Sequence, residues 1–240
     1  AGIYTYAVNC TGSGTFTLPT IARASTINSV TGSKITDNFA VNYTKYSSSF
    51  TNTLQIAVSG GSVTQTISNY ASGATFTLSN AMKTAIYNAT ATSKTVNLAF
   101  SLVTYNGSTV IGTSASKVVK VTINNSNPTI GSLTYIDSNN ATTAITGNNQ
   151  YIIRNKSTLQ VTASTLKALN GASLSSLSAT FSGRTETVTL SGTSDASEVI
   201  NFGTINLSSN ATLTVTLTDS RGNTAVTNVT VLVYDWIAPS

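Results

Sequence analysis

ATLTVTLTDSRGNTAVTNVTVLVYD, residues 211–235, combines two alternating runs around a segment rich in turn-forming residues. Leucine and valine alternate with threonine over residues 211–218, which places apolar side chains on one face of a strand and hydroxyls on the other. The segment DSRGN at 219–223 is rich in turn-forming residues, and Gly222 can adopt the positive φ of a tight hairpin turn. The chain then alternates again through three valines between residues 229 and 233. This stretch predicts a β-hairpin that closes an immunoglobulin-like sandwich.

Prolines divide the chain into repeated units. The three prolines are separated by 109 and 111 residues, and they are Pro19, Pro128 and Pro239. Because proline cannot donate a hydrogen bond to a central sheet ladder, it is typical of strand starts and linkers. The sequence therefore predicts an all-β fold of two tandem immunoglobulin-like β-sandwich modules, module one at 19–127 and module two at 128–238. Residues 1–18 are interpreted as an N-terminal strand segment or the end of a preceding element, and residues 239–240 as the start of a linker to a further module.

Short β-runs follow one another at the spacing typical of a sandwich. In module one, strands are expected at 35–43, 53–59, 63–68, 74–78, 96–105, 109–112 and 117–123. In module two, they are expected at 130–136, 151–154, 158–165, 177–182, 186–190, 199–202, 213–218 and 224–234. Residues 79–88 (SNAMKTAIYN) predict a helix with Ser79 as its N-cap. The polar segment 193–198 (TSDASE) is interpreted as a connection between strands.

The chain carries little charge and distributes it unevenly. Charged residues make up only 8% of the sequence, so the surface must be built largely from Ser, Thr, Asn and Gly, as in an extracellular or virion-type β protein. Residues 1–124 hold seven basic residues and one acidic residue, whereas residues 125–240 hold five basic and six acidic ones. The basic half could face an acidic partner such as a neighbouring subunit or an anionic wall polymer, or its lysines could be solvated and discourage edge-strand aggregation. No run of like charge indicates nucleic-acid binding.

The composition excludes several kinds of chemistry. The sequence has no histidine, which removes Ser-His-Asp and Cys-His nucleophilic systems and His-ligated zinc. Cys10 is the only cysteine, so no intrachain disulfide can form, and it is interpreted as a small apolar residue in a strand. No apolar run is long enough to span a bilayer, so membrane insertion is not expected. We expect a non-enzymatic protein without a cofactor.

The seven carboxylates provide the remaining candidate sites. Asp195 and Glu198 are the candidate pair for a carboxylate-only glycosidase, although no catalytic residue is predicted. Asp137–Asn140 and Asp219–Asn223 gather oxygen ligands and are the best candidates for calcium, although no metal site is predicted. Asp219 is expected instead to accept backbone N–H hydrogen bonds within its own turn.

Aromatic residues could form platforms for sugars. The candidates are Tyr4 with Tyr6 and Tyr43 with Tyr46, and the same rings could instead pack inside the sandwich or against another subunit. Trp236 lies directly before the predicted boundary at Pro239 and is expected to wedge between adjoining modules. Ten Asn-x-Ser/Thr sequons occur, but a chain so rich in these residues contains many by chance, so they are weak evidence for glycosylation.

Several phrases, taken in their order and spacing, resemble a known protein family. They are TLPTIARAS (17–25), SSSFTNTLQ (47–55), YNGSTVIG (105–112), NKSTLQVTAS (155–164) and LTDSRGNTA with VTVLVYDWIAP (217–239). The family consists of minor structural proteins in the tails of siphophages that infect Gram-positive bacteria. The resemblance implies repeated immunoglobulin-like modules, a virion structural role and contact with the host surface. It implies no catalytic or ligand-binding residue.

Two functional hypotheses follow. The first is a segment of a siphophage tail tip or tail fibre, a spacer that presents or contributes to surfaces binding host glycans. The resemblance implies partners for it: other copies of the chain, as a homotrimer, other tail proteins, and a host cell-wall polysaccharide or teichoic acid. The alternative is a cell-surface adhesin or extracellular filament subunit, assembled by donation of residues 1–18 to the next subunit.

Overall fold

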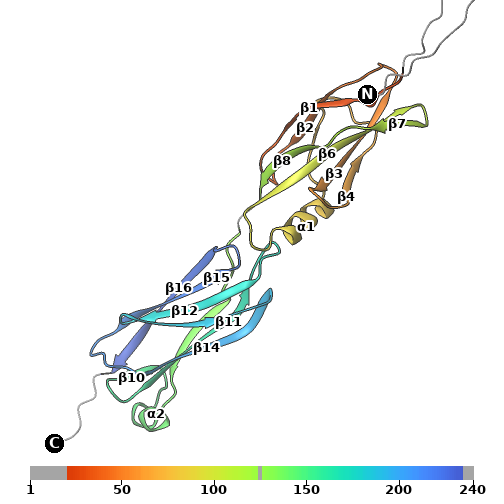
Figure 1. Ribbon diagram of the computed structural model, residues 1–240. Coiled ribbons are helices and arrows are strands. Elements are labelled where there is room, and N and C mark those ends of the chain that lie inside the picture. Colours follow the sequence, from red (N-terminus) through yellow and green to blue (C-terminus); the bar gives the residue numbers. More distant parts are fainter. Residues whose placement is uncertain (1–20, 124–125, 235–240) are drawn as a thin grey trace, which may run out of the picture.

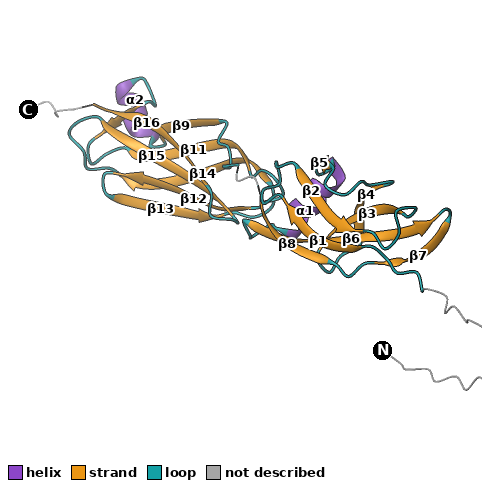
Figure 2. Ribbon diagram, turned by 90° about the horizontal axis from the view of Figure 1, so that it is seen from above, coloured by secondary structure: helices purple, strands orange, loops and turns teal. Residues whose placement is uncertain are grey.

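The structure is a computed structural model that describes residues 21–123 and 126–234. Module one occupies 21–123 of the described chain, module two occupies 128–234, and residues 126–127 lie in the linker. The two modules lie end to end, and views at right angles both show the elongated shape (Figures 1 and 2). Each module has a hydrophobic core of its own. Among the described residues, no helix has the length and apolar character to cross a membrane.

Module one is a sandwich of two antiparallel sheets. Its elements are β1 (Thr26–Thr31), β2 (Phe39–Thr44), β3 (Thr51–Val58), β4 (Val63–Ile67), β5 (Thr75–Phe76), α1 (Asn80–Ala89), β6 (Thr95–Asn106), β7 (Thr109–Thr113) and β8 (Lys117–Thr122). One sheet has the strand order β1-β2-β5, and the other has the order β4-β3-β6-β7. β8 continues beside β6 after β7 ends, so the last strand of this sandwich is broken in two.

The core of module one forms where the apolar faces of its two sheets meet. Every second side chain along most of β6 is buried, as a half-buried strand requires. Phe100 on β6 and Phe39 on β2 are fully buried, and their ring centroids lie 6.0 Å apart. Met82 and Ile86 of α1 add to this core, and the Ser79 hydroxyl caps the helix by accepting a hydrogen bond from the Met82 N–H (3.1 Å). The predicted helix and its N-cap are confirmed.

Module two repeats the sandwich plan with a different distribution of strands. Its elements are β9 (Ser132–Asp137), α2 (Asn140–Thr146), β10 (Tyr151–Ile153), β11 (Thr158–Lys167), β12 (Leu174–Phe181), β13 (Arg184–Thr189), β14 (Ser194–Thr204), β15 (Ala211–Asp219) and β16 (Thr224–Tyr234). A five-stranded sheet has the order β10-β16-β15-β12-β13, and a three-stranded sheet has the order β14-β11-β9. Only the β10–β16 pair is parallel among the described strand pairs.

The predicted closing hairpin is the β15–β16 pair. Thr218 lies opposite Thr224 at its tip, and the ladder continues to Ala211 opposite Val231. Alternate residues of β15 are buried in the core, as the sequence pattern predicts. Gly222 has a φ of 76°, the left-handed conformation expected at this position. The hairpin and the all-β class of two tandem sandwiches are therefore confirmed.

β1 is a strand that the sequence analysis missed. The register between β1 and β2 shifts between Ile27 and Ser29, which marks a bulge. A bulge adds one residue to a strand and breaks the period-two alternation. The apolar residues of this segment therefore do not recur at every second position, and the pattern of a strand is hidden.

The first strand predicted in module one is also shorter than expected. The sequence predicts it over 35–43, but β2 begins only at Phe39. The preceding residues form a turn in which the Asp37 N–H donates to the Lys34 carbonyl (3.0 Å). The Asp37 carboxylate fixes that turn by accepting hydrogen bonds from the backbone N–H groups of Ser33 and Lys34. Polar turn chemistry thus ends the strand earlier than its apolar pattern indicates.

In module two, the interpretation of residues 193–198 as a connection is wrong, because residues 194–204 form β14. In this segment Asp195 lies opposite Leu166 of β11, and Glu198 lies opposite Ala163. β14 is an edge strand of its sheet, so backbone pairing on one side holds it in place. Such a strand can be polar throughout much of its length, which removes the apolar alternation that would predict it.

The helix α2 is the second element that the sequence analysis missed. Asn139 is its N-cap and accepts a hydrogen bond from the Ala141 N–H (3.0 Å), and the helix ends at Gly147 with a φ of 66°. Thr142 is its one buried residue. A seven-residue helix without an apolar stripe has no 3.6-residue periodicity to detect.

Several predicted features lie outside the described residues. They are residues 1–18 with Tyr4, Tyr6 and Cys10, and also Pro19, Trp236 and Pro239. Pro128 is described and buried. The next residue, Thr129, exchanges backbone hydrogen bonds with Lys167 (2.8 and 3.0 Å), so extended structure in module two begins directly after this proline.

Candidate functional site at the junction of the modules

The tip of the β15–β16 hairpin is held rigidly by its own aspartate. Asp219 is 2% exposed, and its Oδ1 accepts hydrogen bonds from the backbone N–H groups of Arg221 (2.9 Å) and Asn223 (2.8 Å). Its Oδ2 accepts a third from the Asn223 side-chain amide (3.1 Å). The predicted structural role of Asp219 is confirmed. This turn fixes the direction in which Arg221 leaves the hairpin.

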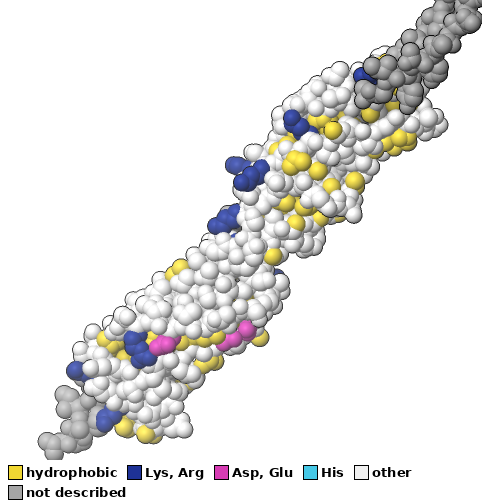
Figure 3. All heavy atoms as spheres, viewed as in Figure 1, with side chains coloured by type: hydrophobic (Ala, Val, Ile, Leu, Met, Phe, Trp, Pro, Cys, Tyr) yellow, Lys and Arg dark blue, Asp and Glu magenta, His cyan; other side chains and the backbone are white. Residues whose placement is uncertain are grey.

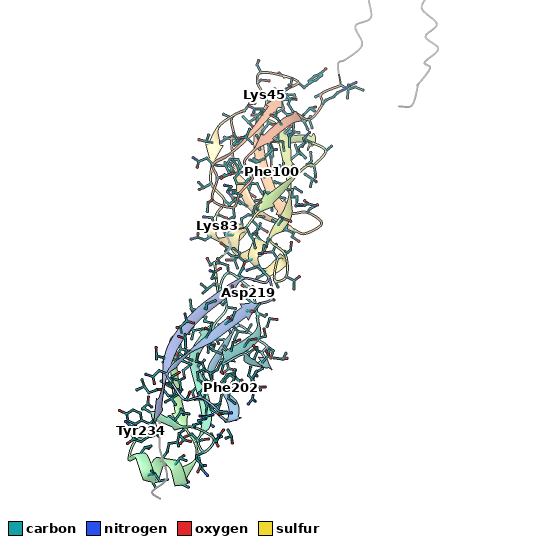
Figure 4. The ribbon with its side chains drawn as sticks, turned by 90° about the vertical axis from the view of Figure 1, so that its left-hand side faces the viewer. Lys45, Lys83, Phe100, Phe202, Asp219 and Tyr234 are labelled. Carbon is teal, nitrogen blue, oxygen red and sulfur yellow. The ribbon has the colours of Figure 1, made fainter. Side chains whose placement is uncertain are left out.

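Arg221 crosses from module two to module one. Its Nε donates to the Thr90 carbonyl (2.7 Å), at the C-terminal end of α1 in module one. Its Nη2 donates to the Asn170 carbonyl (2.6 Å) and Nη1 to the Leu169 carbonyl (3.3 Å), both in the β11–β12 connection of module two. Figure 4 places Asp219, at the base of this turn, where the two modules meet. The guanidinium therefore joins three carbonyls from both modules in one buried cluster.

The electrostatics of α1 explain why a cation belongs at this place. The last turn of α1 contains no basic residue, and the C-terminal carbonyls of a helix carry partial negative charge. Arg221 of module two supplies the missing cation. Burial lowers the pKa of Arg221, and the nearby Asp219 charge acts in the opposite direction. An arginine keeps its proton in proteins, so the cap remains charged at neutral pH.

A serine and a glycine complete the contact beside Arg221. The Ser220 hydroxyl donates to the Ala91 carbonyl of module one and accepts a hydrogen bond from the Ser173 N–H (3.0 Å). Gly171, in the β11–β12 connection, has a φ of 75° and lies against Tyr87 of α1. A Cβ at Gly171 would meet the Tyr87 carbonyl oxygen at 2.8 Å, so the two modules approach too closely there for any side chain.

The sequence predicts the turn role of Asp219 but not the junction that Asp219 supports. It predicts a junction with a further module at Trp236, which lies outside the described residues. The signal that could have found this site is Arg221 itself. Asp219, Gly222 and Asn223 already account for the turn. An arginine beside them, in a chain with only 8% charged residues, therefore indicates a contact outside the turn.

The two candidate calcium segments are both occupied by hydrogen-bond donors. The Asp137 carboxylate accepts hydrogen bonds from the backbone N–H groups of Asn139 and Thr158 (each 2.9 Å) and from the hydroxyls of Ser157 (2.6 Å) and Thr142. Donor hydrogens, rather than further carboxylates, surround it, as they do Asp219. No group of three acidic, histidine or cysteine residues with metal-ligand geometry exists among the described residues. These carboxylates stabilise turns.

The candidate catalytic carboxylates lie on one strand. Asp195 and Glu198 are both in β14, where residues three apart point to opposite faces of a regular strand. The Asp195 carboxylate also accepts a hydrogen bond from the Ser197 N–H (2.9 Å). The structure therefore does not bring this pair together around a common substrate position.

The tyrosine pair of module one is split between core and surface. Tyr43 is 6% exposed and donates its hydroxyl hydrogen to the Tyr70 carbonyl (2.6 Å), so it packs inside the sandwich. Tyr46 is 43% exposed and stacks on Phe50, with ring centroids 6.4 Å apart. A shallow groove beside Tyr46 is also lined by Arg23 and Lys45. Of the two rings, only Tyr46 can act as a surface platform.

Comparison with protein-family models matches residues 4–240 to the family described as "Siphovirus protein of unknown function (DUF859)". The chain belongs to this siphovirus family. The predicted resemblance to siphophage proteins is confirmed at that level. A comparison with curated proteins finds no match.

Several solved structures are similar to this siphovirus protein at low sequence identity. They include a biofilm-associated protein BSP domain (16% identity, TM-score 0.28, 90% of this chain and 30% of that one). A Ca²⁺-stabilized adhesin of an Antarctic bacterium is also similar, with 15% identity and a TM-score of 0.31 over 90% of this chain and 50% of that one. The chicken CNTN1 FN1–FN3 domains have 8% identity and a TM-score of 0.29 over 86% of this chain and 67% of that one. The siphovirus protein thus spans half or less of the first two chains, and no functional argument follows from these likenesses.

Proposed function

We propose that this siphovirus protein is a non-enzymatic structural segment of the phage tail tip or tail fibre. It acts as a stiff spacer that presents, or contributes to, surfaces that bind host glycans. The observation that carries the proposal is the Arg221 cap on α1. Neighbouring domains move relative to one another unless their interface restrains them. A buried guanidinium bonded to carbonyls of both modules supplies that restraint.

Other properties of the molecule support a spacer. The modules are arranged end to end, so each adds length rather than bulk (Figure 1). The fold needs no disulfide, and the low charge leaves a surface of hydroxyls and amides. Location in the tail, assembly as a homotrimer and contact with other tail proteins are part of the proposal. They rest on the resemblance of the sequence phrases together with membership of a siphovirus family.

Immunogold labelling of intact virions tests the proposed location. Antibodies raised against the 240-residue chain are expected to place gold particles at the distal end of the tail or along its fibres, and to reduce phage adsorption to host cells. Antibodies against a capsid protein are the control for accessibility. Gold particles on the capsid, or only on disrupted virions, would contradict a role at the tail surface.

A further inference from the structure

The edge strand β1 of module one is held mainly by its backbone. Its ladder with β2 is interrupted by the bulge between Ile27 and Ser29, and β2 is its only partner among the described strands. No side chain of this fully described strand is buried. Its four polar side chains are exposed and uncharged, like most of the surface in Figure 3, and Ile27 and Val30 are half-buried against the core. Side-chain packing therefore does little to hold β1 in place.

The first strand of module two, β9, is also an edge strand but is held more firmly. All six of its residues pair with β11 without a register shift. The hydroxyl of buried Tyr135 donates to the Gln150 carbonyl (3.0 Å) and accepts a hydrogen bond from the Leu232 N–H (2.9 Å). At the end of β9, the buried Asp137 carboxylate accepts a hydrogen bond from the Thr158 N–H (2.9 Å). The described strand β1 contains no equivalent of either buried side chain.

The residue before β1 is anchored by an incomplete hydrogen-bond network. Ser25 is 1% exposed, and its N–H donates to the Thr104 hydroxyl (2.8 Å), which in turn donates to the Asn52 side-chain carbonyl (2.9 Å). The Ser25 hydroxyl and the Asn52 side-chain nitrogen are buried and have no hydrogen-bond partner among the described residues. Buried polar groups without partners are costly, and release of Ser25 lets water reach its hydroxyl. This anchor therefore resists release less than a complete network does.

The residues after β1 are fixed in place. Gly32 has a φ of 104° and lies against Phe39, where an added Cβ would meet the ring at 2.5 Å. The Thr122 N–H donates to the Ser33 carbonyl (2.8 Å), and the Ile35 N–H donates to the Thr122 carbonyl (2.9 Å). Ile35 is buried and belongs to the core of module one. An opening that starts before β1 therefore stops at Gly32.

The strand β2 is held in place independently of β1. Val41 and Tyr43 are buried, and their N–H groups donate to the hydroxyls of Tyr70 (2.8 Å) and Ser72 (2.8 Å) rather than to β1. Backbone N–H groups alternate in direction along a strand, so the N–H of the intervening Asn42 faces β1. Loss of β1 therefore exposes one edge of β2 and leaves its other edge and its buried side chains in position.

We propose that residues 25–31, the β1 strap, open as a unit while the rest of module one stays folded. A segment with little buried side-chain area can open at a lower free energy than its whole domain. The role of the β1 strap in the virion rests on the proposed function. In a tail spacer, the open strap gives the chain that enters module one a flexible joint, whereas the Arg221 junction with module two stays stiff. The spacer then yields at β1 before either sandwich unfolds.

Hydrogen exchange of the full 240-residue chain, resolved for each amide by NMR at increasing denaturant concentration, tests the proposal. Without denaturant, the Asn42 N–H is expected to be protected on the order of tenfold less than the Val41 N–H of the same strand. Its opening is expected to depend little on denaturant, because a short segment exposes little surface. The Val41 amide and the β9 amides, which are the control, are expected to exchange only when their own module unfolds.

Two single variants separate the β1 strap from a general loosening of module one. Ser25→Ala removes the hydroxyl that lacks a partner and keeps the backbone hydrogen bond to Thr104, so opening is expected to become about threefold to tenfold rarer. Ser29→Ala is the matched control, because it removes an exposed hydroxyl from the same segment. It is expected to leave the frequency of opening within about twofold of the wild-type value.

Three results would overturn the proposal. They are equal protection of the Asn42 and Val41 amides, local opening of β9 to the same extent as β1, and more frequent opening in Ser25→Ala. The virion labelling separates this failure from that of the proposed function. Tail labelling without local opening removes the β1 strap alone, whereas local opening with gold on the capsid removes the tail location and leaves the strap as a property of the fold.

Discussion

In module two, the carboxylates of Asp137 and Asp219 are buried at 2% exposure and accept hydrogen bonds from surrounding backbone and side-chain groups. Module one holds its one described carboxylate, Asp37, at the surface, and all six of its lysines are exposed or half-buried. The two sandwiches share a fold class but place their ionisable residues differently. Module two buries Asp137, Asp219 and Arg221 to hold turns and the junction, whereas the turn that Asp37 holds in module one lies at the surface. The same fold class therefore accommodates carboxylates either as buried internal supports or as surface groups.

The largest effect that this difference predicts is on the Asp137 site. In the Asp137→Ala variant, Ser157, Thr142 and two backbone N–H groups lose their acceptor in a buried place. The free energy of unfolding of module two is expected to fall by about 2–4 kcal/mol, because buried donors left without partners are costly. Hydrogen exchange of the β9 and β11 amides at increasing denaturant concentration measures this loss of unfolding free energy. The Asp37→Ala variant is the control, and an equal loss of stability in module one would remove the contrast between the modules.

An intermediate effect is expected at the closest contact between the modules. Gly171→Ala places a Cβ at 2.8 Å from the Tyr87 carbonyl oxygen and should open the junction. Gly183→Ala is a matched control, since Gly183 has a φ of 78° and no atom within 4 Å of its added Cβ. Both variants place an alanine in the left-handed backbone conformation, which costs about 1–2 kcal/mol of stability. Only Gly171→Ala is expected to increase hydrogen exchange at the C-terminal end of α1; increased exchange in both would show that backbone strain alone acts there.

The smallest effect concerns the exposed carboxylate of module one. Hydrogen bonds from the Ser33 and Lys34 N–H groups lower the pKa of Asp37 below its ordinary value of 3.8. A lowered folded-state pKa means that the ionised form stabilises the fold above pH 3.8, and that this contribution is lost as the pH falls through the folded-state pKa. The wild-type protein is therefore expected to lose slightly more module-one stability on acidification than Asp37→Asn. Thermal unfolding between pH 5 and 2, on either side of an ordinary carboxylate pKa, compares them, and parallel curves would contradict this role for Asp37.

Sequence patterns predicted those parts of the fold that depend on side-chain period. The alternation over residues 211–218 is sufficient for β15, and Ser79 with Met82 and Ile86 is sufficient for α1. β1 and the first part of β14, residues 194–198, were missed because a bulge in one and a polar edge in the other remove the alternation while backbone pairing persists. No local sequence pattern specifies which distant strands pair with one another.

The candidate site was predictable only in part for the same reason. The turn bonds of Asp219 join residues within the same five-residue segment, so local chemistry predicts them. The bond from Arg221 to Thr90 joins residues 131 positions apart, and it exists only once both modules are folded and aligned.

The junction can be tested directly by the distance distribution between spin labels on Thr66 of β4 and Thr189 of β13, measured by double electron–electron resonance in a Cys10→Ser background. Both positions are exposed, and each lies in a different module. The wild-type protein is predicted to give one narrow distance peak, which Arg221→Met broadens while the surface control Arg154→Met does not. A broad distribution in the wild-type protein, or a narrow one that survives Arg221→Met, would contradict the claim that Arg221 fixes the two modules into a stiff spacer.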